Sequence, residues 1–182
     1  LWPNPRTVSL ELLTRKRFHP ATTLNVLAAA WLQFMIRDWF SHGPGPKENP
    51  WQLKIESGDT WHENPMTVLR TRPDPTRPAG TDGAPPTYAN TETHWWDGSQ
   101  IYGSSKEAQQ KVRSGHGGKL IVDSDGLAPI DDAVLRQPGS WLGLAILHNL
   151  FTLEHNSICD RLQKEYPAGS DDALFEHARL IN

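Results

Sequence analysis

Cysteine is nearly absent from this sequence of 182 residues, which contains Cys159 alone. A single cysteine cannot form an internal disulfide, so the fold does not depend on an oxidising compartment. Cys159 lies in an apolar helical pattern, where a buried and inert thiol is expected rather than a nucleophile. The lack of disulfides favours a cytoplasmic protein, with association at a membrane surface as the alternative.

An excess of basic residues is also missing. The chain has 18 Lys and Arg residues against 21 Asp and Glu residues, and its formal net charge is -3. No basic cluster offsets this balance, so nucleic acid is not an expected partner.

Long apolar runs and several common enzyme motifs are missing as well. The longest apolar stretch is interrupted at Gln33 and falls short of the roughly 20 residues that a membrane span needs, so no transmembrane segment is predicted. No signal peptide is visible. The sequence has no zinc-ligand spacing, no Gly-rich phosphate loop, no G-x-S-x-G elbow and no Cys-His nucleophile signal.

The composition that is present suits a globular domain with much surface loop. Hydrophobic residues make up 37% of the chain, beside 15 prolines, 14 glycines and 8 tryptophans. This length can bury one substantial core, so residues 1–182 are predicted to form a single domain. The chain starts at Leu1 rather than Met and stops at "ALFEHARLIN", inside an amphipathic helical pattern, so we expect a fragment of a longer domain.

The periodicity predicts a mainly α-helical fold. Helices are expected from Thr22 or Thr23 to about Phe40, over "SKEAQQKVRS" with Ser104 or Ser105 as cap, from Ser140 to about Tyr166, and from about Asp171 onward. The other expectations are an irregular arm over residues 1–20, a short strand in "WQLKIE", a long Pro/Gly-rich loop over residues 70–90, and a small β-hairpin over "GKLIVDSDGLAPI".

The run "QFMIRDW", residues 33–39, places polar side chains in an otherwise apolar helix. Gln33 and Arg37 are four residues apart and share one face, whereas Asp38 is rotated by about 100° onto a neighbouring face. Polar groups are costly to bury without partners, so both faces need one. Spacing alone leaves two interpretations open: two ligand-binding faces, or a polar seam satisfied by neighbouring backbone.

The segment "TETHWWDGSQIYGSS" offers hard oxygen donors. Thr93, Asp97 and Ser99 stand at alternating or near-alternating positions in a loop that ends at Gly103. Such oxygens, with backbone carbonyls, suit Ca²⁺, which takes about six to eight oxygen ligands. One carboxylate is too few for a strong site, and Asp38 is a candidate for the second. A purely structural, turn-rich loop is the alternative.

A pair of histidines lies in "LHNLFTLEHNSICDRL". His148 and His155 are seven residues apart, about two turns of one helix, with Glu154 beside the second. Metal-binding histidines on a helix are commonly four apart, as in H-E-x-x-H, and that motif is absent. We interpret His155 and Glu154 as a hydrogen-bonded core element in preference to a metal site.

Taken in order, the three segments resemble the animal-type haem peroxidase superfamily, specifically its branch of fatty-acid α-dioxygenases and related microbial peroxidases. "QFMIRDW" is similar to a distal-helix pattern Q-F-x-x-H-D-W at every marked position but one. "THWWDGSQIYGS" matches a calcium-loop pattern T-x-aromatic-x-D-x-S-x-x-Y-G-S, and "LFTLEHNSICD" matches L-F-x-x-E-H-N-x-x-C-D. The resemblance covers most of the chain and implies a partial haem-peroxidase-like helical fold from a longer catalytic domain.

The resemblance implies two cofactors, calcium and haem. The implied calcium ligands are two carboxylates, two hydroxyls and one backbone carbonyl, from Asp38, Asp97, Thr93, Ser99 and Trp95. Calcium would hold the distal helix so that its other face is fixed against the haem. On that face the resemblance implies catalytic, haem-binding roles for Gln33 and Arg37, with Arg136 as a further haem-side arginine.

Arg37 stands where the family has its distal histidine. In the peroxidase reaction that histidine takes a proton from bound peroxide and returns it to the leaving oxygen, which requires a pKa near neutrality. Arginine stays protonated up to about pH 12 and cannot act as a base, although its fixed charge can polarise the O–O bond. Ordinary peroxidase turnover is therefore not expected.

The family's proximal histidine, which ligates iron, and the radical tyrosine of the α-dioxygenases follow the E-H-N helix and fall beyond Asn182. The chain is expected to supply the distal half of the haem pocket to a peroxidase or fatty-acid dioxygenase. The implied partners are hydrogen peroxide or dioxygen, a fatty acid or small organic reductant, and the remainder of the catalytic domain. The alternative is a non-catalytic, calcium-stabilised helical scaffold in which Arg37 binds an anion.

Overall fold

The computed structural model describes residues 2–43, 45–81, 83–128 and 140–182. The chain forms two compact units, Leu1–Thr22 with Ser41–Thr91, and Thr23–Phe40 with Glu92–Asn182. Each unit is described by itself. The single domain expected over residues 1–182 stays a prediction.

The first unit begins with a short helical segment. α1, Pro5–Val8, is capped by Asn4, whose side chain accepts a hydrogen bond from the Arg6 N–H, and η1, a π-helical turn over Ser9–Leu13, follows directly. The irregular arm predicted for residues 1–20 is therefore wrong over this stretch. The reason is local, because Asn is a favoured cap and the fixed φ of Pro5 suits the first helical position.

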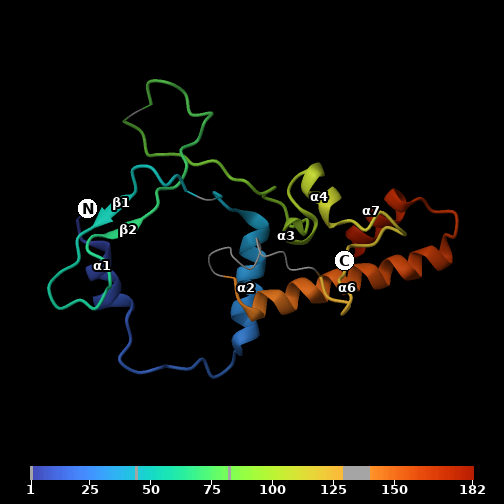
Figure 1. The fold of residues 1–182 in the computed structure, drawn as a ribbon, viewed down its shortest axis with the longest axis horizontal. Coiled ribbons are helices and arrows are strands. Elements are labelled where there is room, and N and C mark those ends of the chain that lie inside the picture. The colour runs from blue at the N-terminus through green and yellow to red at the C-terminus, as the bar shows by residue number, and fades with distance from the viewer. Residues whose placement is uncertain (1, 44, 82, 129–139) are drawn as a thin grey trace. The chain divides into compact units, whose positions relative to one another are not determined.

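The first unit also contains a two-stranded antiparallel sheet (Figure 1). β1, Trp51–Leu53, pairs with β2, Met66–Val68, and Trp51 lies opposite Val68. β1 confirms the strand predicted in "WQLKIE". The described part of residues 70–90 has no helix or strand and carries an isolated bridge between Pro73 and Tyr88, as expected for a segment rich in Pro and Gly.

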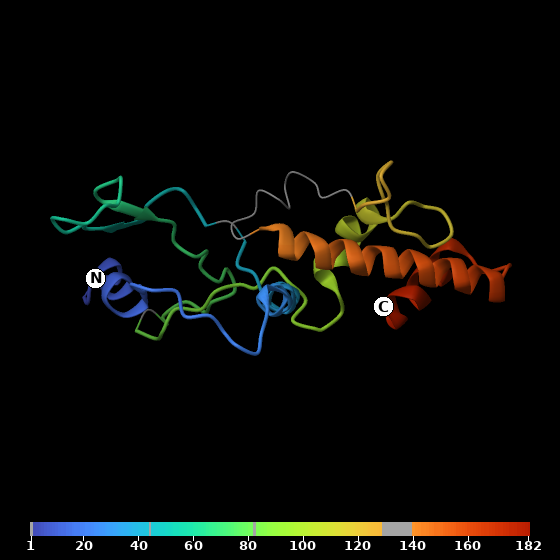
Figure 2. The same cartoon turned by 90° about the horizontal axis from the view of Figure 1, so that it is seen from below.

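The second unit is built on two crossing helices, α2, Val26–Trp39, and α6, Leu142–Glu165. α2 crosses α6 near the N-terminal end of α6 (Figures 1 and 2). α6 confirms the helix predicted from Ser140 to about Tyr166. The cap predicted for α2 at Thr22 or Thr23 is wrong, because Asn25 accepts the Leu27 N–H at 3.0 Å and starts the helix later.

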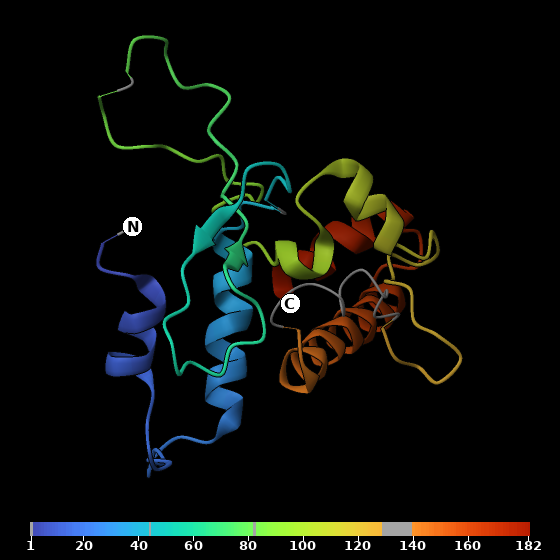
Figure 3. The same cartoon turned by 60° about the vertical axis from the view of Figure 1, so that its left-hand side comes forward.

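The described part of the second unit has three further helices (Figure 3): α3, Ser99–Tyr102; α4, Lys106–Val112; and α7, Asp171–Ile181. α3 and α7 contact α6, and α4 contacts α3. Ser105 caps α4 by accepting the Ala108 N–H, and α7 begins at Asp171, so both predicted helices are confirmed. No described helix is long and apolar enough to cross a membrane.

The β-hairpin predicted over "GKLIVDSDGLAPI" is wrong for residues 118–128, which contain no strand. Asp123 and Leu127 form the expected turn, with Asp123 N donating to Leu127 O at 2.7 Å. Leu120, however, makes an isolated bridge with Arg113, and its N–H and C=O both bond the Asn156 side chain on α6. An amide side chain thus satisfies the backbone groups that a second strand was expected to pair.

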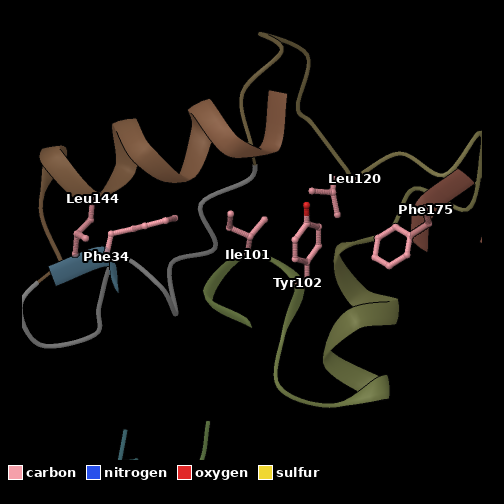
Figure 4. Packing of buried hydrophobic residues seen from close by; sticks show 6 residues of the cluster. All are labelled: Phe34, Ile101, Tyr102, Leu120, Leu144 and Phe175. Carbon is pink, nitrogen blue, oxygen red and sulfur yellow. The ribbon is translucent and has the colours of Figure 1, made fainter. Parts of the chain in front are cut away.

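The core of the second unit joins these helices (Figure 4). Its buried members are Phe34, Ile101, Tyr102, Leu120, Leu144 and Phe175. Phe34 of α2 stacks on Phe151 of α6 with ring centroids 5.3 Å apart, and Leu144 lies beside Phe34 (Figure 4). This packing holds α2 against α6, and the mainly α-helical fold is confirmed.

Candidate functional site

Gln33 and Arg37 lie on one face of α2, against the residues that open α6. The Trp141 indole Nε1 donates to Gln33 Oε1 at 2.8 Å, and Arg37 Nη2 donates to Ser140 Oγ at 3.4 Å. The helical spacing of four residues therefore brings the two predicted site residues to neighbouring partners. Arg136, the third predicted member of this group, lies outside the described residues.

The electrostatics of this face are set by Arg37. Burial lowers the pKa of Arg37, because a charged group loses water on entering the protein. The guanidinium pKa starts at about 12 or above, so Arg37 remains a cation near neutral pH. This face can donate hydrogen bonds and hold positive charge, but Arg37 cannot serve there as a general base.

Asp38 points to a different partner, the loop that precedes α3. Its side chain is 6% exposed, and its Oδ1 accepts the Ser99 N–H at 2.7 Å and the Ser99 hydroxyl at 2.9 Å. Gly98, with φ of +70°, donates its N–H to Asp38 Oδ2 at 3.4 Å. A buried carboxylate needs such donors, so the loop and the distal helix are tied together through Asp38.

The other three predicted calcium ligands lie in the same loop. Thr93 Oγ1 donates to Asp97 Oδ1 at 2.9 Å, and the Trp95 N–H donates to Thr93 Oγ1 at 3.4 Å. Asp97 Oδ2 also meets Arg179 Nη2 of α7 at 3.4 Å. Trp95 is 74% exposed, so its indole does not pack into the loop.

These residues fit a hard cation in their chemistry. Two carboxylates and two hydroxyls come from one loop and one helix end, and oxygen is the ligand atom that Ca²⁺ prefers. Within the described residues, no three His, Cys, Asp or Glu side chains cluster so as to hold a metal. A cation here would therefore depend on hydroxyl and carbonyl oxygens as well as on Asp38 and Asp97.

His155 is fully buried and has both ring nitrogens engaged. Its Nε2 donates to the Gly118 carbonyl at 2.9 Å, so its Nδ1 accepts from the Tyr102 hydroxyl at 3.0 Å. Burial lowers the pKa of His155, which favours the neutral ring. His155 is thus unsuited to ligating iron, and its interpretation as a hydrogen-bonded core residue is confirmed. The same interpretation of Glu154 is wrong, because Glu154 is exposed on α6.

Burial also shifts the pKa values of two more side chains on α6, Cys159 and His148. Burial raises the pKa of the Cys159 thiol to about 11, and the side chain is fully buried, so the prediction of an inert thiol is confirmed. Burial also lowers the pKa of His148. Neither group has the properties of a reactive nucleophile.

A cavity of about 630 Å³ in the second unit lies along the Trp31 and Asp38 side of α2. Its lining includes the aromatic rings of Trp31, Phe34, Trp96 and Phe151. Two amide oxygens in its wall, Gln100 Oε1 and Asn182 Oδ1, are buried without a hydrogen-bond partner among the described residues. Gln33 and Arg37 do not line this cavity.

The partners of the predicted residues were not apparent from the sequence motifs. Ser140 and Trp141 contact Gln33 and Arg37 across more than 100 residues of chain. The sequence feature that could have pointed to this contact is "SWLG", residues 140–143. It places a glycine in the first turn of a long helix, where alanine would be favoured. Gly118, which binds His155 through its carbonyl, gave no comparable signal.

Comparison with known proteins places the whole chain in one family. The family model described as "Animal haem peroxidase" matches residues 1–182. The chain is 39% identical over 187 residues to "Alpha-dioxygenase 1" of Capsicum annuum and 35% identical over 185 residues to "Alpha-dioxygenase PIOX" of Oryza sativa subsp. japonica. These matches cover 98% of this chain but 28% and 29% of the relatives, so the chain spans under a third of their length.

The chain is also similar in structure to solved dioxygenase and peroxidase structures. The crystal structure of Oryza sativa fatty acid alpha-dioxygenase matches with a TM-score of 0.81 and 31% identity, over 98% of this chain and 30% of that one. Peroxidase A from Dictyostelium discoideum matches with a TM-score of 0.76 over 96% of this chain and 40% of that one, and its identity of 22% supports the fold alone.

Proposed function

Because this chain belongs to the animal haem peroxidase family, we propose that it forms the distal half of the haem pocket in a haem-dependent oxidoreductase of the α-dioxygenase type. The observation that supports this most directly is the placement of Gln33 and Arg37 on one face of α2, where Trp141 and Ser140 contact them. Haem, when bound, would supply the redox chemistry.

In this proposal Gln33 and Arg37 bind and orient an oxygen-containing ligand by donating N–H groups. Arg37 stabilises negative charge that develops on that ligand, since a fixed cation in a partly buried site acts more strongly than in water. Arg37 cannot take a proton, so the acid-base transfer of an ordinary peroxidase is not carried by this position. A dioxygenase that starts from a radical rather than from rapid peroxide turnover suits this chemistry better.

The substrate class proposed is a fatty acid together with dioxygen or hydrogen peroxide. The support is the similarity to Oryza sativa fatty acid alpha-dioxygenase, whose solved structure is 31% identical over 98% of this chain. A small organic reductant is the alternative substrate. The chain itself offers a basic group for an acid, because Arg37 can hold a carboxylate through two parallel hydrogen bonds.

We also propose a structural calcium ion bound by Asp38, Asp97, Thr93, Ser99 and the Trp95 carbonyl. The support is two hydrogen-bonded pairs, Thr93 with Asp97 in the loop before α3, and Asp38 of α2 with Ser99 at the start of α3. Calcium would neutralise the buried Asp38 charge and fix the register of α2, which in turn fixes Gln33 and Arg37.

The iron ligand is proposed to come from outside this chain, in the remainder of the catalytic domain. His155 uses both ring nitrogens in the core, so it offers no lone pair to iron. The isolated 182-residue chain is accordingly not expected to hold histidine-ligated haem iron. A full Soret band with histidine-ligated iron in the isolated chain would contradict this arrangement.

A second candidate function is a non-catalytic, calcium-stabilised scaffold. The observation that favours it is Arg37, which removes the acid-base group from the position where the resemblance expects a histidine. In that case Arg37 would bind an anion, such as a fatty-acid carboxylate, without turnover.

The substitution Arg37→His distinguishes the two functions. If the pocket is a modified enzyme, histidine restores a proton acceptor, and peroxide turnover by the haem-loaded full-length protein should rise by about 10²-fold, at the low end of general-base effects. The matched control is Arg161→His, which changes an exposed arginine on α6 and should leave turnover unchanged. Turnover that stays at its original level in Arg37→His would favour the scaffold.

A further inference from the structure

The side chain of Trp141 lies against the backbone of Gly143 in the first turn of α6. A Cβ atom placed at Gly143 would lie 2.5 Å from Cζ3 and 2.8 Å from Cζ2 of the Trp141 ring, far inside van der Waals contact. Gly143 is buried, and a glycine inside a helix is unfavourable relative to alanine. The glycine therefore has a packing reason, which is to leave room for the indole.

The indole held in this way makes one directed contact. Its Nε1–H donates to Gln33 Oε1 at 2.8 Å. An indole N–H can only donate, so the Gln33 atom that faces it must be the carbonyl oxygen, and the NH₂ end of the amide must point the other way. The contact thus removes the ambiguity that an amide side chain otherwise has between its two ends.

We propose that Gly143 and Trp141 are positioning residues that fix the amide of Gln33 so that it presents N–H donors, together with Arg37, to a ligand on the distal side of the haem. The inference rests on the proposed function and adds to it which class of ligand the pocket selects. A face that offers an amide NH₂ and a guanidinium favours anions and oxygen acceptors, and it disfavours ligands that must donate a hydrogen bond.

The surrounding packing makes this orientation rigid. Trp141 packs against the buried cluster that contains Leu144 and Phe34, so the indole is anchored on both helices that it joins. Leu144 N and Ala145 N both donate to the Trp141 carbonyl, which fixes the backbone at the start of α6. A change at Gly143 should therefore move the indole while the backbone start of α6 is kept.

The first test uses the protein without haem and measures hydrogen exchange of the Trp141 indole by ¹⁵N NMR, with the resonance assigned by its loss in Trp141→Phe. Exchange is expected to be slower than at Trp2, whose side chain is 95% exposed. Gln33→Leu, which removes the acceptor, and Gly143→Ala should each speed this exchange by about tenfold. An unchanged rate in either variant would overturn the proposal.

The second test uses the haem-loaded complete catalytic domain, which includes the proposed iron ligand, and measures the fluoride dissociation constant from the absorption spectrum across pH. Trp141→Phe and Gly143→Ala should each weaken fluoride binding by about tenfold, the loss expected for a misplaced donor to an anion. The double variant should be no weaker than either single one, because both act on the same amide. Gly83→Ala, where a Cβ meets nothing within 4 Å, is the control and should bind fluoride normally.

The two tests separate the inference from its premise. A complete catalytic domain that takes up no haem would overturn the proposed function, while the indole exchange rates would still decide whether Gly143 and Trp141 hold Gln33. Fluoride affinities that fall additively in the double variant, or that stay unchanged in both single variants, would overturn the positioning role.

Discussion

At the scale of single residues, the buried hydroxyl of Tyr102 and the buried ring of His155 are satisfied by specific partners. Tyr102, 2% exposed, donates to His155 Nδ1 and accepts from Asn182 Nδ2 at 2.7 Å. Burial raises the pKa of Tyr102 to about 12, so its hydroxyl keeps its proton near neutral pH. The three side chains form a chain of hydrogen bonds that ends at the Gly118 carbonyl.

Removal of this hydroxyl should destabilise the second unit. Tyr102→Phe leaves the ring in place but takes the donor from His155 Nδ1 and the acceptor from Asn182. An unsatisfied buried group costs about 1–3 kcal/mol, so the free energy of unfolding, measured by urea denaturation, should fall by about that amount. Tyr166→Phe is the matched control, since Tyr166 is 64% exposed and should cost little. Equal effects at both positions would contradict the assigned network.

The residue scale also shows what spacing could predict. The separation of Gln33 and Arg37 by four positions, and the rotation of Asp38 from them, follow from helix geometry alone. The partners that decide their chemistry, Trp141 and Ser99, come from other parts of the chain and needed the folded structure. Arg37 was identified as unusual through the family resemblance, which implies a histidine at this position. The departure matters because the side chains of arginine and histidine differ in pKa by about six units.

At the scale of elements, close approach of backbones explains where glycine is required. Gly118 has φ of +73°, and a Cβ there would lie 2.5 Å from Phe175 N and 2.8 Å from Leu174 C of α7. The segment before Leu120 therefore approaches α7 through a glycine that no side chain could replace. The ion pair between Arg113 and Asp171, at 2.6 Å, joins the end of α4 to the start of α7 beside it.

Two alanine substitutions separate the close approach from the backbone conformation. Gly115 has φ of +72° and a Cβ there meets nothing within 4 Å, so Gly115→Ala carries the conformational cost alone, about 1–2 kcal/mol. Gly118→Ala adds steric overlap worth about 1–3 kcal/mol more. Chemical denaturation of both variants should rank Gly118→Ala as clearly less stable. A similar loss in the two proteins would argue that α7 does not approach Gly118 closely.

Helix positions were predictable because they depend on local patterns, and the errors had local or tertiary causes. α4 was predicted with a serine cap, and α6 was predicted from its broad apolar surface; both signals act within a few residues. The predicted hairpin was wrong because the Asn156 side chain of α6 binds the Leu120 backbone. This contact spans 36 residues and cannot be predicted from the residues that neighbour Leu120 in sequence. The helical start at Asn4 was within reach of local rules and was not predicted.

At the scale of the whole molecule, the proposed calcium ion should act as a ligand that stabilises the folded state. Chelation should lower the melting temperature of the protein by several degrees, since a ligand at 100 times its dissociation constant contributes about 2.7 kcal/mol. In Asp38→Asn the remaining Oδ1 still accepts the Ser99 N–H, but the charge is lost, so the chelator effect should disappear.

The control for this experiment is Asp125→Asn, which changes an exposed carboxylate in the turn at Asp123 and should keep the full response to chelator. Melting temperatures that are identical with and without calcium in the unaltered protein would rule out the proposed calcium site. If chelation still lowers the melting temperature of Asp38→Asn, the ion must be bound by ligands other than Asp38.

The sequence by itself determined the class of this protein, because helix periodicity, caps and three short motifs are local patterns that can be read along the chain. It also determined that position 37 lacks an acid-base group. Only the tertiary structure decided which groups meet: Trp141 with Gln33, Ser99 with Asp38, and Tyr102 with His155. The physical reason is that hydrogen bonds and steric room depend on distances between residues far apart in sequence, and those distances exist only once the helices pack.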